Sequence, residues 1–156
     1  MSTNLPVEIE SNWLNINGLQ IRAYALGSGE PLLLLHGGGV DGALLSWRLA
    51  MPALAARCRV IAVDWPGYGE SQPNPQPNTM DFYVEFTGAV MDALGLQRSG
   101  LMGLSLGGGA ALGFGNCRIG VRGGFCNQGG AGVTLSGFLV VFGNVALFLG
   151  FGGIHK

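Results

Sequence analysis

Residues 101–109 place a serine between two glycines, in the pattern glycine-x-serine-x-glycine formed by Gly103, Ser105 and Gly107. An apolar run precedes the serine, and a run of small, helix-compatible residues follows it. The pattern predicts a serine on a sharp turn that leads from a strand into a helix. Its neighbours must be small because the serine backbone is strained and the strand and helix approach closely. In a chain with 29 glycines this pattern is a weak signal by itself, so its context has to be considered.

Two further motifs precede this serine. Residues 31–35 form an apolar run that leads into a histidine and three glycines at positions 36–39. Residues 59–64 form a second apolar run that ends in an aspartate and a glycine turn. Neither run alternates between apolar and polar residues, as expected for parallel strands that helices cover on both faces.

In this order and spacing, the three motifs resemble the N-terminal half of an α/β-hydrolase, over residues 13–114. They are similar to the serine-dependent members: esterases, C–C-bond hydrolases and aminopeptidase-like enzymes. The resemblance implies that Ser105 is the nucleophile and that the backbone N–H groups of Gly38 and Leu106 form the oxyanion hole. Such donors stabilise charge that appears only in the transition state. A serine, rather than an aspartate, at position 105 argues against a haloalkane dehalogenase or an epoxide hydrolase.

The same resemblance implies structural roles for two polar residues that resemble catalytic groups. His36 ends the first strand and is expected to be a structural histidine rather than a base. Asp64 ends the second strand and is expected to hold the turn that follows it, rather than to bind a metal ion or donate a proton.

The predicted fold class is α/β: an incomplete α/β-hydrolase with a mostly parallel sheet and an N-terminal antiparallel hairpin. Residues 13–24 predict the hairpin, because their apolar and polar residues alternate around Asn17 and Gly18, two residues that tolerate positive φ. Alternating strands and helices in the rest of the chain predict parallel strands joined by right-handed crossovers.

Two helices are expected between the predicted strands. Residues 46–56 predict a helix with Ser46 as its N-cap. Pro52 would kink or restart this helix. Residues 82–94 carry an apolar side chain every fourth residue, so we expect a helix capped by Asp81 and ended by Gly95.

The composition excludes several classes of function. A net charge of −1 provides no field that would attract nucleic acid. The glycine loops match neither a dinucleotide-binding motif nor a Walker A loop, and the three cysteines have no metal-ligand spacing. We therefore expect no cofactor, no metal and no nucleic-acid partner, and the resemblance implies a small-molecule carbonyl substrate. No basic-then-apolar leader is present, so a cytoplasmic location is expected. The oligomeric state stays open.

Residues 115–156 depart from the pattern of residues 1–114, the predicted N-terminal part of the hydrolase domain. This tail is rich in glycine, shows no lasting period of 2 or 3.6 residues and contains no Asp or Glu. A change of reading frame near residues 113–115, or a truncation, is the favoured interpretation. A novel domain is one alternative. A membrane segment over residues 135–151 is another, because this uncharged stretch is close to the minimum spanning length.

The tail bears directly on function. A serine hydroxyl is a good nucleophile only when an oriented base accepts its proton, and in this family an acid and then a histidine follow the serine. No Asp or Glu follows Ser105, and the only later histidine, His155, matches no family motif. The sequence predicts a hydrolase of esters, lactones, amides or C–C bonds that is inactive or severely impaired in this form. The alternatives are a non-catalytic fragment and a small membrane-associated protein anchored by residues 135–151.

Overall fold

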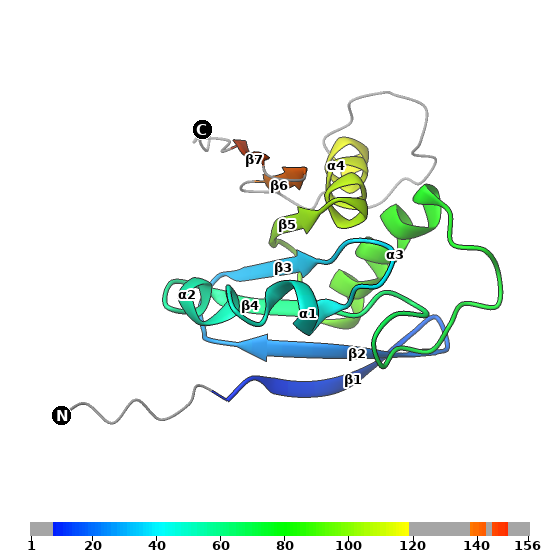
Figure 1. The fold of residues 1–156 in the computed structure, drawn as a ribbon, viewed down its shortest axis with the longest axis horizontal. Helices are drawn as coiled ribbons and strands as arrows, with labels where there is room; N and C mark the ends of the chain where they lie inside the picture. The colour runs from blue at the N-terminus through cyan, green and yellow to red at the C-terminus, as the bar shows by residue number, and fades with distance from the viewer. Residues whose placement is uncertain (1–7, 119–137, 143–144, 150–156) are drawn as a thin grey trace.

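The computed structural model describes residues 8–118, 138–142 and 145–149. In these residues a seven-stranded sheet has the order β1-β2-β4-β3-β5-β6-β7, from the bottom to the top of Figure 1. The strands are β1 (Glu10–Ile16), β2 (Leu19–Leu26), β3 (Pro31–Leu35), β4 (Arg59–Val63), β5 (Gly100–Leu104), β6 (Phe138–Phe142) and β7 (Val145–Leu149). The helices are α1 (Ala43–Trp47), α2 (Met51–Ala55), α3 (Met80–Ala93) and α4 (Leu106–Arg118).

The N-terminal hairpin is confirmed. Strands β1 and β2 pair antiparallel, with Ile16 opposite Leu19 at the turn. The two turn residues, Asn17 and Gly18, have φ values of 52° and 84°, the left-handed conformation that a tight hairpin turn requires. The side-chain oxygen of Asn15 accepts the Gly18 N–H at 3.1 Å and closes the turn. Strand β2 then joins the hairpin to the parallel strands through antiparallel pairing with β4.

The centre of the sheet consists of β4, β3, β5 and β6, which run parallel to one another. Both faces of β3 and β4 are buried, as the sequence predicted, and so are both faces of β5. On β3, Leu33 and Leu35 belong to the apolar cluster that includes α3 and α4, whereas Leu34 belongs to the cluster that includes α1 and α2. The turns that follow the carboxyl ends of β3 and β5 are therefore carried on strands that packing holds from both sides.

The helix predicted over residues 46–56 is divided into two. Helix α1 begins after Gly42, not at Ser46, and α2 begins at Met51 with Pro52 in its first turn. Ser46 lies inside α1, so its expected role as an N-cap is wrong. Proline is tolerated only in the first turn of a helix, because its ring clashes with the preceding turn, so the chain starts a new helix there.

Helix α3 is present with its apolar side turned inward, where Phe86 and Val90 are buried. Its N-cap is Thr79, whose hydroxyl oxygen accepts the Phe82 N–H at 3.2 Å. The prediction of Asp81 as the cap is therefore wrong; Asp81 lies in the first turn, where a negative charge still favours the helix dipole. Gly95 ends the helix as predicted, with a φ of 66°.

The described part of the tail extends the sheet. Helix α4 continues to Arg118, and β6 pairs parallel with β5 while β7 pairs antiparallel with β6. The apolar runs that form β6 and β7 are rich in β-branched and aromatic residues, which favour strands. Strand β5 is thus paired on both sides. Within the described ranges no helix is both long and apolar enough to cross a membrane, and the segment 135–151 lies partly outside them.

Candidate active site

Ser105 is the single residue between strand β5 and helix α4. It follows the last residue of β5 and precedes the first residue of α4. Its side chain is exposed, and its φ of 51° is one of two positive values found on non-glycine residues in the described chain. Such a conformation costs on the order of 1–3 kcal/mol, and surrounding structure must enforce it. The predicted strand-to-helix turn is therefore present, and Ser105 is exposed on it.

The glycines on either side of Ser105 allow this turn to form. A Cβ built on Gly103 would lie 2.2 Å from the Gly107 carbonyl oxygen. A Cβ built on Gly107 would lie 2.1 Å from the Leu35 carbonyl oxygen and 2.6 Å from that of His36. The first contact is within the turn, and the second is between α4 and the end of β3. Both positions thus exclude any side chain.

The glycine loop after β3 lies beside Ser105. A Cβ built on Gly37 would lie 3.7 Å from the Ser105 Cβ, and one built on Gly38 would lie 3.5 Å from the Leu106 side chain. Gly38 and Leu106, the two predicted oxyanion-hole residues, are therefore neighbours although 68 positions separate them. In the described chain no hydrogen bond uses either backbone N–H as a donor. The N–H groups of a first helical turn have no partner within their own helix.

Asp41 holds this loop in place. Its carboxylate accepts hydrogen bonds from the Gly37 N–H at 2.9 Å, the Gly42 N–H at 2.7 Å and the Ser46 hydroxyl at 2.8 Å. These bonds hold Gly37, the residue that immediately precedes Gly38. The sequence analysis did not identify Asp41. A short acidic side chain after three glycines, a residue type that commonly bonds to nearby backbone in turns, was the available signal.

His36 is structural, as predicted. Its ring is fully buried, and Nε2 accepts the Trp65 backbone N–H at 3.0 Å. Nδ1 lies 2.8 Å from the Gly37 carbonyl oxygen and donates to it in the tautomer that leaves Nε2 free to accept. Burial lowers the pKa of the imidazole below its ordinary value of 6.5, although the Gly37 carbonyl and Asp41 act in the opposite direction. Both ring nitrogens are occupied, so His36 has no free nitrogen for Ser105.

This lowered pKa predicts how folding stability depends on pH. Below pH 6.5 the unfolded chain protonates His36 while the folded chain keeps it neutral, so the free energy of unfolding falls as the pH falls. We expect urea unfolding between pH 7.5 and 5 to show a steeper loss of stability in the wild type than in a His36→Asn variant. Carboxylates and the other histidine contribute to both proteins and cancel. Equal pH slopes would contradict a buried neutral imidazole.

Asp64 is also structural, as predicted. It is buried, and its carboxylate accepts the Ala43 N–H at 2.7 Å and the Glu70 N–H at 3.1 Å. The Tyr24 hydroxyl donates to it at 3.5 Å. Asp64 thus connects the first residue of α1 to the turn after β4.

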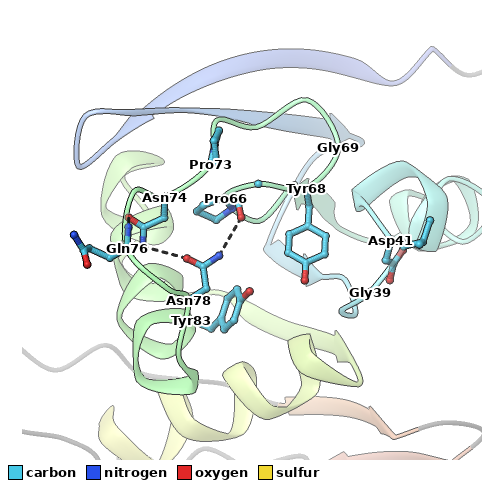
Figure 2. A pocket seen from close by; sticks show the side chains of 12 residues that line it. Gly39, Asp41, Pro66, Tyr68, Gly69, Pro73, Asn74, Gln76, Asn78 and Tyr83 are labelled. Atoms are coloured by element: carbon cyan, nitrogen blue, oxygen red, sulfur yellow. Dashed lines mark hydrogen bonds between the residues drawn. The ribbon is translucent and has the colours of Figure 1, made fainter.

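A cavity of about 460 Å³ lies next to the glycine loop (Figure 2). Its walls are residues 39–41 after β3, residues 66–69 after β4, several residues of the loop 73–78, and Tyr83 of α3. The loop 73–78 has no regular structure, because its three prolines disfavour both helix and strand. Figure 2 shows the Tyr68 ring between Asp41 and Tyr83. Ser105 is not part of the wall. Tyr68 is part of it, and the Tyr68 hydroxyl oxygen lies 3.8 Å from a Cβ built on Gly38, the residue predicted to form the oxyanion hole with Leu106.

The described residues bring the predicted nucleophile beside the predicted oxyanion-hole residues, but they contain no free imidazole. His36 is the one histidine among them, and His155 lies outside them. They also contain no group of three or more His, Cys, Asp or Glu side chains arranged to hold a metal ion. What they can do chemically is present a hydroxyl to a carbonyl carbon and bind the oxygen that becomes negative.

Comparisons with known proteins agree with this geometry. The sequence model of the "alpha/beta hydrolase fold" family matches residues 30–113. The chain is 40% identical to a 2-hydroxymuconate semialdehyde hydrolase of Pseudomonas sp. (strain CF600) over 61% of this chain and 34% of that protein. A meta-cleavage product hydrolase of Pseudomonas fluorescens has a similar structure, with a TM-score of 0.69, 27% identity, and coverage of 83% of this chain and 43% of the other.

A further solved structure, of the epoxide hydrolase CorEH, superposes with a TM-score of 0.63 and 30% identity, over 70% of this chain and 38% of the other. The chain spans between 26% and 41% of the length of the first curated relatives that it matches.

Proposed function

This chain belongs to the α/β-hydrolase family, and we propose that it carries the serine nucleophile of a hydrolase that acts on a small carbonyl substrate. In this proposal Ser105 attacks the carbonyl carbon, and the N–H groups of Gly38 and Leu106 bind the oxygen. One observation carries the proposal: an exposed serine at positive φ, between β5 and α4, with the glycine loop of β3 against it. Such a strained conformation at an exposed polar residue is typical of a functional site.

The proposed chemistry proceeds by acyl transfer. The Ser105 oxygen forms a bond to the carbonyl carbon, and the carbonyl oxygen takes up the negative charge between the two N–H donors. One donor of this kind contributes about 3 kcal/mol to transition-state stabilisation. The leaving group then departs, and water hydrolyses the acyl-enzyme. The proton of the serine hydroxyl needs an acceptor at the first step, and the described residues offer no imidazole for it.

The relatives bear on the class of substrate. Two of them are hydrolases of a semialdehyde and of a meta-cleavage product, and a third is an epoxide hydrolase. Of these chemistries we propose attack on a carbonyl carbon, because residue 105 is a serine and not an aspartate. Ester, lactone, amide and C–C-bond hydrolysis all proceed through this step.

A fluorophosphonate probe tests the proposal, because its phosphorus reacts with a serine hydroxyl and its oxygen occupies the oxyanion hole. We expect slow modification at a single residue, identified as Ser105 by mass spectrometry, and no modification of the Ser105→Ala variant. Without a base, the hole and binding still provide on the order of 10³-fold over reaction in water. Ser46, whose hydroxyl is bonded to Asp41, serves as an internal control and should stay unmodified. Modification spread over several serines, or none in folded protein, would overturn the assignment of Ser105.

A further inference from the structure

We propose that the Tyr68 hydroxyl is a third donor of the oxyanion hole, beside the backbone N–H groups of Gly38 and Leu106. The inference rests on the proposed function, because the oxygen that Tyr68 binds is the one that becomes negative when Ser105 attacks. It adds a side chain to a hole that the sequence motifs assign to backbone groups alone. In this role Tyr68 contacts the reacting oxygen and takes no part in removing the proton of Ser105.

Tyr68 lies at the predicted oxyanion hole. Its hydroxyl oxygen is 3.8 Å from a Cβ built on Gly38, and two side-chain carbons of Leu106 are 3.5 and 3.7 Å from the same point. Tyr68 and Leu106 are both partly buried and pack against the apolar cluster that includes α3 and α4. The space beside the Gly38 backbone is therefore bordered by the residue that follows the nucleophile and by a phenol hydroxyl.

The position of the Tyr68 ring is fixed by its surroundings. The ring makes an edge contact with the buried His36 ring, with 5.2 Å between the ring centroids. His36 is itself held, because its Nε2 accepts the Trp65 backbone N–H. The backbone N–H of Tyr68 donates to the Trp65 carbonyl oxygen at 2.9 Å. The hydroxyl is thus in place before a substrate binds, and a donor that needs no rearrangement is the kind that stabilises a transition state.

Tyr83 determines which group the Tyr68 hydroxyl can still bind. The two hydroxyl groups lie next to each other (Figure 2). Burial raises the pKa of Tyr83 above its ordinary value of 10.0, a hydrogen bond from Asn78 lowers it, and a hydrogen bond with Tyr68 raises it. A bond that raises the pKa of a phenol stabilises its protonated form, so Tyr83 donates to the Tyr68 oxygen. A phenol has one proton, and Tyr68 therefore keeps its own proton for another acceptor.

Tyr83 is fixed from the side away from Tyr68. Its ring packs edge-on against the buried Trp65 ring, with 5.0 Å between the centroids. Asn78, which donates to the Tyr83 hydroxyl, accepts a hydrogen bond from Asn74 at 3.1 Å (Figure 2). Donation therefore runs from Asn78 through Tyr83 to Tyr68. In such a chain each bond polarises the next donor, so the Tyr68 O–H at its end is a stronger donor than an isolated phenol.

The test compares two p-nitrophenyl probes that differ in one atom: the diethyl phosphate, with P=O, and the diethyl thiophosphate, with P=S. With either probe the Ser105 oxygen bonds to phosphorus, p-nitrophenolate leaves and the serine proton passes to solvent. The phosphoryl oxygen takes up the charge that the hole binds, whereas sulfur is a weak hydrogen-bond acceptor. The ratio of the two modification rates therefore measures the donors. Both rates are followed on the 156-residue chain by mass spectrometry of the Ser105 peptide.

We expect Tyr68→Phe to lower the oxygen-to-sulfur ratio about tenfold, as the loss of a hydrogen bond to a charged acceptor predicts. Phenylalanine keeps the ring contact with His36, so the rate with the sulfur probe should be nearly unchanged. Tyr83→Phe, which removes the donor to Tyr68, should lower the ratio less, by about threefold. Tyr24→Phe removes a phenol hydroxyl that bonds to Asp64 instead, and it should preserve the ratio.

Two results with the modified serine would overturn the inference. An unchanged ratio in Tyr68→Phe would mean that its hydroxyl does not bind the reacting oxygen. An equal loss of rate with both probes would mean that Tyr68 only supports the structure of the site. Were Tyr68→Phe not to fold, an unchanged ratio in Tyr83→Phe would equally refute the third donor.

The same experiment separates this inference from the proposed function. If neither probe modified Ser105 in folded protein, the nucleophile and the third donor would both be refuted. Modification of Ser105 with an unchanged ratio would refute the role of Tyr68 alone.

Discussion

The 156-residue chain is expected to hydrolyse a p-nitrophenyl ester no more than about twofold faster than its Ser105→Ala variant. Removal of a triad member typically lowers kcat by a factor of about 10⁴ or more. Every Asp and Glu of this chain precedes Ser105, so no acid is available in the family's order to orient a base. The one described imidazole, that of His36, donates to and accepts from backbone groups and is buried.

The measurement is the difference in initial rate between the wild type and Ser105→Ala at equal concentration and pH. Both proteins share every other surface nucleophile, so the difference isolates Ser105. A second comparison uses Gly38→Ala, which places a methyl group 3.5 Å from Leu106 beside the predicted oxyanion hole. A wild-type rate more than tenfold above both variants would contradict this prediction. It would mean that a base does reach Ser105 in this chain.

Gly107→Ala is expected to destabilise the fold by about 3 kcal/mol or more, a large part of the total stability of a typical domain. The added methyl carbon would lie 2.1 Å from the Leu35 carbonyl oxygen and 2.5 Å from its carbon. These are backbone atoms of the central strand β3, which pairs on both sides and cannot shift without breaking its ladder. Relief requires α4 to move away from the sheet and to take Ser105 with it. Urea unfolding, followed by circular dichroism, measures the loss.

Gly109→Ala is the matched control in the same helix. Near a Cβ at this position lies the flexible end of the Met80 side chain, at 3.0 Å, which can move aside. Alanine in a helix is more stable than glycine by roughly 0.5–1 kcal/mol, so this variant should be neutral or slightly more stable. If the two variants were equally destabilised, the effect would come from helix composition. The proposed contact between α4 and β3 would then be wrong.

Much of the fold followed from local patterns. The hairpin around Asn17 and Gly18, the apolar strand before the glycine loop and the amphipathic α3 all appeared where the sequence predicted them. The helix boundaries were less accurate. Ser46 and Asp81 have the residue types of N-caps, but the caps are Gly42 and Thr79. Several residues near a helix start can cap it, and packing against the sheet selects among them.

The tail was the least predictable part. Its composition gives no lasting period, yet two of its apolar segments pair with β5 and with each other as β6 and β7. Pairing of a strand depends on an edge provided by residues far away in the chain, and no window of sequence contains that information. The division of the chain at residue 114 stays a prediction, and α4 continues past it to Arg118.

The sequence alone determined the class of the fold and the turn that carries Ser105, because apolar runs that end in glycine turns, in this order, predict parallel strands followed by tight turns. It also determined that no acid follows Ser105. The tertiary structure decided what surrounds that serine: Gly38 beside Leu106, Asp41 on the glycine loop, and Tyr68 between the loop and a polar cavity. Asp41 bonds within its own loop, but the contacts of Gly38 with Leu106 and with Tyr68 join segments separated by tens of residues. They exist because the parallel strands end at one edge of the sheet, where sequence neighbours say nothing about spatial ones.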